Sequence, residues 1–249
     1  MTTLLKANEV TKIYAKGQHP SLNKVSFNVA ESEFIAIMGA SGSGKTTLLN
    51  VLSTIDTPTS GSIVINGINL KQLSDTDAAD FRRDNLGLIF QEYFLLDSLT
   101  IQENISVPLT LQKLPPKKIE KMVRSLAERF CIASQLDKYP NELSGGQRQR
   151  ASAARAIVKQ PSILFADEPT GALDSSSATE LLKTLKEANE ELHTTILMVT
   201  HDAYAASFAN RILIFKDGSI IRELLKQNAD RRAFYEVIAR EVAKLDTER

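Results

Sequence analysis

The sequence predicts an α/β fold with a mostly parallel core sheet, an N-terminal antiparallel β part and an inserted helical subdomain. Four apolar segments of strand length are separated by helical or loop segments, which is the layout of a parallel sheet with crossover connections. They are EFIAIM (33–38), NLGLIF (85–90), SILFAD (162–167) and TTILMVT (194–200). Between residues 91 and 160 the strand signal gives way to helical patterns, which we interpret as the inserted subdomain.

Each element has a local signal. The alternating segment SFNVA (26–30) and a hairpin-like pair around Gly61 and Gly67 predict the antiparallel part. The segment PKKIEKMVRSLAERF (116–130) predicts a helix, in a region punctuated by prolines. The helical region contains Pro108, Pro115, Pro116 and Pro140.

The chain end also has a helical signal. After a turn at Asp217-Gly218, the segment RRAFYEVIAREVAKL (231–245) predicts a helix. One stripe of it carries Phe234, Ile238, Val242 and Leu245. This stripe predicts a helix packed on the body of the protein, and a partner-binding helix stays open as the alternative.

We therefore expect one domain over residues 1–249. Its core would comprise residues 1–90 and 160–228, the helical subdomain residues 91–159, and the C-terminal helix residues 229–249.

Composition excludes several function classes. Thirty Lys and Arg balance thirty Asp and Glu, so the chain lacks the basic field of a nucleic-acid-binding protein. The single cysteine, Cys131, excludes an internal disulfide, fits a reducing cytosol and is expected to be a small buried side chain. The N-terminus lacks the apolar core of a signal peptide, and no stretch reaches the roughly 18 apolar residues that span a bilayer.

The segment GASGSGKT (39–46) matches the phosphate-loop pattern between a predicted strand and a predicted helix. Glycines let the backbone approach phosphate oxygens, and the helix directs its N–H groups and positive dipole end at them. Lys45 adds a positive charge, and Thr46 offers a hydroxyl to Mg²⁺. The segment predicts a nucleoside triphosphate site.

Acidic residues end the strand SILFAD. Asp167 is expected to face Mg²⁺, and Glu168 to act as general base toward the attacking water. Three further residues are weaker candidates when each is taken alone: His201 as a γ-phosphate sensor after TTILMVT, Gln91 as a water or Mg²⁺ contact after NLGLIF, and Tyr14 as a stacking partner for adenine.

A second anion-suited helix start occurs in LSGGQ (143–147), where Ser144, Gly145 and Gly146 precede a predicted helix. It has no acidic catalytic residue close by in sequence. A two-fold dimer accounts for both sites, because the phosphate loop of each copy would then face the Ser-Gly-Gly of the other across one ATP. Asp174 is placed to cross that interface or simply to cap a helix.

Together these motifs resemble ATP-binding cassette (ABC) ATPases along essentially the whole chain: GASGSGKT, the glutamine of FQEYFLL, LSGGQ, ILFADE, ALD and the histidine of VTHD. The resemblance implies a phosphate-loop ATPase of ABC type with ATP and Mg²⁺ as cofactors. It implies catalytic roles for Glu168, His201 and Gln91, and Mg²⁺ contacts from Thr46, Gln91 and Asp167. The implied ATP contacts are Tyr14, Gly39, Ser41, Gly42, Ser43, Gly44, Lys45, Thr46, Thr47, Ser144, Gly145, Gly146 and Gln147. Gly171 departs from the serine found in many relatives.

The segments EPTGALD and FQEYFLLDSLTIQENISVPL are similar to the branch that serves macrolide-exporter, lipoprotein-releasing and cell-division permeases. Within it, the tail DRRAFYEVI and the segments around the motifs resemble bacitracin-resistance ATPases. This implies a homodimer at the cytoplasmic face of the membrane, a separately encoded permease and a sensor histidine kinase acting through it. Tyr93, Phe94, Leu95 and Leu96 are then either a surface for a permease helix or subdomain core.

Three alternatives stay open. The chain would be the ATPase of a lipoprotein- or macrolide-type transporter, the ATPase of a nutrient importer, or a soluble ABC ATPase that serves no transporter. The last class carries two cassettes in one chain or long coiled-coil insertions, and neither occurs in these 249 residues.

Overall fold

The computed structural model describes residues 2–15 and 19–247. The chain forms two compact units. The first comprises Met1–Leu73 and Thr195–Arg249, and the second comprises Ser74–Thr194. Each unit is described by itself. Within the described ranges, no helix combines the length and apolar content that a membrane span requires.

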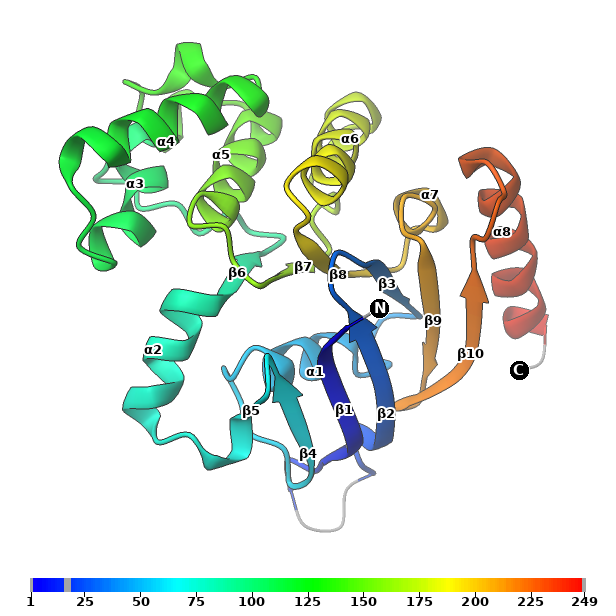
Figure 1. Cartoon of the computed structure of the whole chain (residues 1–249). Coiled ribbons are helices and arrows are strands. Elements are labelled where there is room, and N and C mark those ends of the chain that lie inside the picture. Colours follow the sequence, from blue (N-terminus) through cyan, green and yellow to red (C-terminus); the bar gives the residue numbers. More distant parts are fainter. Residues whose placement is uncertain (1, 16–18, 248–249) are drawn as a thin grey trace. The chain divides into compact units, whose positions relative to one another are not determined.

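The first unit contains an antiparallel sheet with the strand order β2-β1-β4-β5 (Figure 1). Its strands are β1 (Thr3–Lys12), β2 (Leu22–Ala30), β4 (Ser60–Ile65) and β5 (Ile68–Asn69). Buried and exposed residues alternate along much of β2, as expected for a sheet with one face in the core. The predicted antiparallel part is therefore confirmed, and β1 pairs with both β2 and β4.

The first unit also contains strands β3 (Phe34–Met38), β8 (Thr195–Thr200) and β9 (Arg211–Lys216), with β3 lying between β8 and β9 and parallel to both. Every residue of β3 and β8 is buried, which explains why these strands appear as continuous apolar runs. Strand β10 (Ser219–Leu225) turns back antiparallel to β9 through Asp217 and Gly218, both at positive φ.

The α-helices described in the first unit are α1 (Lys45–Leu52), α7 (Ala203–Ala206) and α8 (Arg231–Thr247). Helix α8 contacts α7 and lies beside β10 in Figure 1. Its stripe residues Phe234 and Ile238 are buried, so the helix packs on this unit. The side chain of Leu245 lies outside the described residues. The Arg231 guanidinium lies 4.8 Å from the ring centroids of both Tyr204 and Phe208.

The second unit contains the parallel pair β6 (Leu86–Ile89) and β7 (Ile163–Asp167). Its helices are α2 (Asp75–Asn85), α3 (Ile101–Leu111), α4 (Pro116–Arg129), α5 (Gly145–Ile157) and α6 (Ser175–Glu191). Short 3₁₀ helices occupy Leu70–Gln72 in the first unit and Ala133–Gln135 and Pro140–Glu142 in the second. Helix α5 contacts α3, α4, α6 and β6, and it is therefore central to this unit (Figure 1).

The α/β class with a mostly parallel core sheet is confirmed, because only β10 runs against its neighbour among the core strand pairs described above. Helices α3, α4 and α5 occupy the stretch 91–159 that was expected to be helical. The expected division of one domain at residues 90, 159 and 228 stays a prediction.

The prediction for Cys131 is wrong, because its side chain is exposed. Cys131 follows the C-terminal cap of α4 and has a φ of 53°, while its N–H donates to the Glu128 carbonyl at 3.0 Å. A left-handed residue in this position ends the helix, and here it leaves the thiol in solvent while the preceding Phe130 is fully buried.

Candidate functional site

The predicted phosphate loop connects the buried strand β3 to helix α1. A Cβ on Gly39 would lie 2.1 Å from the Phe215 carbonyl oxygen. Gly44 has a φ of 102°, and a Cβ there would lie 2.3 Å from the Ser21 carbonyl oxygen. Both positions therefore require glycine, and the backbone of β9 and of residue 21 fixes the shape of the loop.

Two polar side chains are buried in this loop. The Lys45 Nζ donates to the Ala40 carbonyl at 2.8 Å, so the lysine at the start of α1 is bonded to the beginning of the loop. Ser43 is 8% exposed, and its buried Oγ has no hydrogen-bond partner in the part of the chain that the structure describes. A buried hydroxyl without a partner is costly, and a phosphate oxygen would satisfy it. The next two residues, Thr46 and Thr47, form the first turn of α1 together with Lys45.

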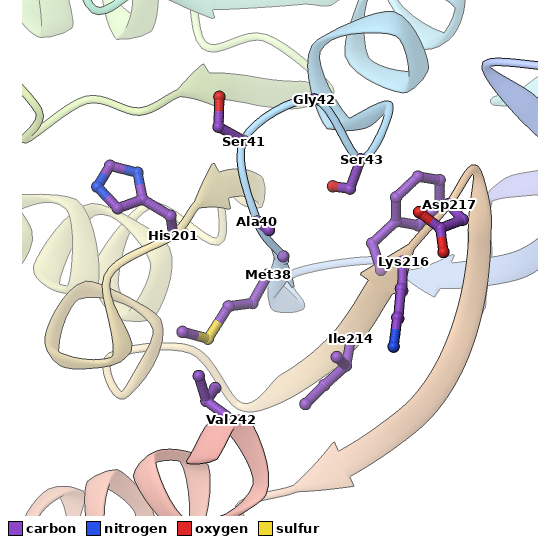
Figure 2. A pocket seen from close by; sticks show the side chains of 12 residues that line it. Met38, Ala40, Ser41, Gly42, Ser43, His201, Ile214, Lys216, Asp217 and Val242 are labelled. Atoms are coloured by element: carbon purple, nitrogen blue, oxygen red, sulfur yellow. The ribbon is translucent and has the colours of Figure 1, made fainter. Parts of the chain in front are cut away.

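A pocket of about 450 Å³ opens beside the loop, entirely within the first unit. In Figure 2 the His201 ring lies to one side of the loop and Lys216 to the other, with the apolar side chains of Met38 and Val242 below. The remaining lining residues are Gly39, Ala40, Ser41, Gly42, Ser43, Ile214, Phe215 and Asp217. The structure thus brings the phosphate loop and His201 to one pocket, as a γ-phosphate sensor requires.

His201 is exposed and follows the last residue of β8. The next residue, Asp202, caps α7 by accepting from the Tyr204 N–H at 2.8 Å, and its own N–H donates to Thr200 Oγ1 at 3.0 Å. These two bonds hold the chain on the C-terminal side of the histidine, so the strand and the capped helix together determine where the imidazole lies.

Tyr14 is 57% exposed, which suits a residue whose ring would stack on a base. The ammonium of Lys12 lies 4.9 Å from the centre of this ring and forms an ion pair with Asp56 at 2.6 Å. Burial alone would raise the pKa of the Asp56 carboxyl, but the hydrogen bonds to it, that from Lys12 foremost, together outweigh burial and the pKa is lowered. The sequence did not predict this ion pair, because Lys12 and Asp56 are 44 residues apart and belong to no motif.

In the second unit, Asp167 ends β7 and Glu168 begins the turn that follows. Both side chains are half-buried. Glu168 has a φ of 44°, a left-handed conformation that residues other than glycine seldom adopt. Its carbonyl accepts from the Gly171 N–H at 3.0 Å, which closes the turn.

Gln91 is exposed and lies against that turn. A Cβ on Gly171 would lie 3.2 Å from both Cδ and Nε2 of Gln91. The glycine that departs from the family pattern therefore gives room to the Gln91 amide. The structure brings together Gln91 and the turn after Glu168, while the catalytic roles of both residues stay predictions.

The LSGGQ segment begins helix α5 with reciprocal caps. The Ser144 Oγ accepts from the Gln147 N–H at 3.3 Å, and the Gln147 Oε1 accepts from the Ser144 N–H at 2.9 Å. Gly146 is buried against α6, since a Cβ there would lie 2.6 Å from Ser177 Oγ. Ser144 itself is exposed at the helix start, where backbone N–H groups can meet an anion.

Asp174 caps helix α6 by accepting from the Ser176 and Ser177 N–H groups at 3.0 Å each. The backbone hydrogen bond from Ser177 lowers the pKa of this carboxyl. The helix-cap alternative is thus confirmed, and the cross-interface role stays a prediction.

The segment after Gln91 forms a partly exposed surface. Phe94 is 61% exposed and Leu96 is 49% exposed, so the alternative of subdomain core is wrong for these two residues. Tyr93 and Leu95 are half-buried. A pocket of about 470 Å³ lies here, lined by Glu92, Tyr93, Phe94, Leu95, Asp97, Pro140, Asn141 and Arg148.

The chain is similar to several known proteins. A family model described as ABC transporter matches residues 22–171. The bacitracin export ATP-binding protein BceA of Halalkalibacterium halodurans is 50% identical over 237 residues, which cover 94% of each protein. The macrolide export ATP-binding/permease protein MacB of Vibrio parahaemolyticus is 42% identical over 89% of this chain and 34% of its own length.

Solved structures agree. The ATP-binding cassette MJ0796, in a dimeric post-hydrolysis state bound to ADP and Pi, matches with a TM-score of 0.83 and 37% identity. The match covers 90% of this chain and the whole of that one.

Proposed function

Because the chain belongs to the ABC transporter family, we propose that two copies bind two ATP molecules between them and that this dimer powers a separately encoded membrane permease. The chain is an ATPase that converts ATP and water to ADP and phosphate. The observation that carries the proposal is the phosphate loop itself, whose buried Ser43 Oγ has no hydrogen-bond partner among the described residues and would be satisfied by a phosphate oxygen.

The phosphate loop and the LSGGQ segment would serve the same nucleotide from different copies. In each copy the backbone of residues 39–47 and the Lys45 ammonium would hold the phosphates, and Tyr14 would stack on adenine. The partner subunit's Ser144 and Gly146 would contact the γ-phosphate, with Gly145 and Gln147 of the partner subunit completing that helix start. The exposed Ser144 and the capped start of α5 support this role.

The residues present fit Mg²⁺. Thr46, Gln91 and Asp167 offer a hydroxyl, an amide oxygen and a carboxylate, and Mg²⁺ prefers hard oxygen donors. Among the described residues no three His, Cys, Asp or Glu side chains gather into a metal-ion group. Mg²⁺ is commonly bound through only one or two carboxylates beside substrate phosphates and water. When bound, the ion would neutralise charge that builds on the triphosphate.

Glu168 would accept a proton from the attacking water. As it does so, the water oxygen would bond to the γ-phosphorus, and the bond between that phosphorus and the ADP oxygen would break. Gln91 would orient that water or contact the metal ion, and its place against the turn after Glu168 supports this. His201 would donate to a γ-phosphate oxygen and so respond to phosphate loss, and its place on the phosphate-loop pocket supports this.

The surface formed by Tyr93, Phe94, Leu95 and Leu96 would receive a helix of the permease. Two aromatic rings stand at this surface, and acidic Glu92 and Asp97 lie beside basic Arg148 along the same pocket. A partner helix with an apolar side and a few charged residues would bury the exposed Phe94 ring. Movement of this segment would then displace the neighbouring Gln91.

We further propose that the transporter confers resistance to peptide antibiotics that act on the cell wall, since BceA, a bacitracin export ATP-binding protein, is 50% identical over 94% of each chain. The ATPase would lie at the cytoplasmic face of the membrane through its permease. A sensor histidine kinase would act through the same permease.

The test replaces Glu168 by Gln. Turnover is expected to fall by about 10² or more with ATP affinity unchanged, because base catalysis contributes roughly 10²–10⁴. Glu187→Gln, an exposed glutamate on α6, is the matched control and should keep its turnover. Phosphate release and titration with a fluorescent ATP analogue measure the two quantities.

The same samples test the dimer. Light scattering should detect an ATP-dependent dimer of the Glu168→Gln variant, in which hydrolysis no longer separates the copies. A monomer that hydrolyses ATP at full rate at every concentration would contradict the proposal, as would unchanged turnover in Glu168→Gln.

A further inference from the structure

We propose that Gln149, a buried residue of α5 beyond the LSGGQ motif, is a positioning residue for hydrolysis that holds the backbone beside both Gln91 and Glu168. The inference rests on the proposed roles of these two residues. It assigns the geometry of the general base to a fully buried side chain.

The Gln149 amide joins two distant turns of the second unit. Its Nε2 donates to the Phe90 carbonyl at 3.0 Å and to the Pro169 carbonyl at 2.7 Å. Phe90 directly precedes Gln91, and Pro169 directly follows Glu168. A single amide group therefore connects the residues adjacent to both catalytic candidates.

The orientation of this amide is chemically determined. Both partners are carbonyl oxygens, which only accept, so a reversed amide would place its oxygen against two acceptors. Gln149 has no exposed surface, and its Oε1 has no hydrogen-bond partner among residues 2–15 and 19–247. The side chain thus leaves one acceptor unsatisfied while both of its donors bind the two turns. Such an arrangement is unfavourable unless the two bonds matter.

The turn that Gln149 holds contains an unusual backbone. Glu168 has a φ of 44°, and residues in sparsely populated regions persist only where their surroundings over-determine them. The Gly171 N–H restrains this turn from within, at 3.0 Å from the Glu168 carbonyl. Gln149 restrains it from another element, α5, at the adjacent peptide.

The two turns also touch. The Gln91 amide lies directly beside Gly171, because a Cβ on that glycine would lie 3.2 Å from the amide. Gln149 therefore sets the backbone on either side of a contact between Gln91 and the Glu168 turn. Loss of its donors would loosen the carboxylate and the glutamine together.

Neighbouring residues of α5 provide a control. Ser152 lies one helical turn further on, is equally buried and donates to the Tyr93 carbonyl at 2.9 Å. Arg155 donates to that same carbonyl at 2.9 Å, so removal of the serine hydroxyl leaves it with a donor. Ser152→Ala thus removes a similar buried bond from α5 without affecting the carbonyl of Pro169.

The experiment uses the full chain with Mg²⁺ and ATP. Gln149→Leu keeps most of the volume without donors, and Gln149→Asn keeps donors on a side chain too short to reach both carbonyls. Each should lower kcat by about tenfold with a change in KM below about twofold, because misplacing a base removes part of its roughly 10²–10⁴ contribution. Ser152→Ala should stay within about twofold of the unchanged protein in both constants.

A double-mutant cycle separates positioning from general damage. Combined with Glu168→Gln, either Gln149 substitution should lower kcat by much less than about tenfold, since the base is already absent and only the effect through Gln91 remains. If the fold-losses in kcat of the two single variants multiplied in full in the double variant, the inference would be overturned. It would also be overturned if Gln149→Leu and Gln149→Asn kept full kcat while Glu168→Gln was slow. Full turnover in Glu168→Gln would instead overturn the proposed base, and this inference with it.

Discussion

Gly146 permits a direct test of how the LSGGQ helix is seated. A Cβ at this position would lie 2.6 Å from Ser177 Oγ and 2.9 Å from Ser177 Cβ on α6. Rotation of the serine would relieve the contact with Oγ, but it would leave the contact with Cβ. Gly146→Ala therefore forces α5 and α6 apart by several tenths of an ångström.

Two opposing effects decide the magnitude. Overpacking of this kind costs about 1–3 kcal/mol. Alanine is better than glycine inside a helix by roughly 0.5–1 kcal/mol, and this gain is smaller in the first turn. Steric cost prevails, so we expect Gly146→Ala to lower the free energy of unfolding by about 1–2 kcal/mol. In a chain of this size that corresponds to a melting temperature lower by roughly 2–8 °C.

Ser177→Gly removes both contacting atoms and reverses the expectation. In that background Gly146→Ala should leave the melting temperature unchanged or raise it, because only the helix preference remains. Circular dichroism melts of the four proteins measure the cycle. An unchanged melting temperature in the single Gly146→Ala variant would refute the described packing, and an equal loss in both backgrounds would refute Ser177 as its cause.

Two further predictions concern stability. Arg231→Ala removes a guanidinium that lies 4.8 Å from the rings of both Tyr204 and Phe208, and should lower the melting temperature of the chain by a few degrees, since each such contact is worth about 0.5–1 kcal/mol. Arg232→Ala, next to it and highly exposed, is the control and should leave the temperature unchanged in the same melt. Burial lowers the pKa of Lys159 from 10.5 to about 8, so between these values the unfolded chain keeps a proton that the folded chain has released. The free energy of unfolding of the unchanged chain, relative to Lys159→Met, should therefore rise with pH across this window in urea titrations, and a fall would contradict the assigned pKa.

The core strands and the nucleotide motifs were predictable because their signals are local. Strands β3 and β8 are buried along their whole length, so they appear in the sequence as unbroken apolar runs. The phosphate loop was also predictable, because Gly39 and Gly44, which close backbone contacts require, belong to one continuous sequence motif. Helix α2 was not predicted, because it buries only Phe81 and has no apolar stripe for a periodicity argument to detect.

Long-range partnerships were not predictable. Gln149 is an ordinary helix residue in the sequence, and its role becomes apparent only when Phe90 and Pro169, 59 and 20 residues away, come to the same amide. The predicted burial of Cys131 was wrong for a related reason. The general preference of cysteine for the interior was outweighed by a left-handed backbone at a helix end.

The hydrogen bonds of α5 also bear on how a permease would affect hydrolysis. Arg155 donates to the carbonyls of Tyr93 and Phe94, and Ser152 donates to that of Tyr93. Bonds from a charged group contribute roughly 1.5–3 kcal/mol each, so the exposed Phe94 stands on a segment firmly attached to this helix. The Tyr93 hydroxyl in turn lies 3.0 Å from the position of a Cβ on Gly145, at the start of the same helix.

A force on the exposed aromatic segment therefore has two routes inside the second unit. One leads through the Tyr93 ring and the α5 side chains to the LSGGQ helix start, and the other leads through the backbone to Gln91. Because Gln149 belongs to the same helix and holds the turn after Glu168, α5 would carry the anion-binding start and the base together. A permease that shifts this helix would then align or disturb both at once, which couples dimer closure to hydrolysis without a separate relay.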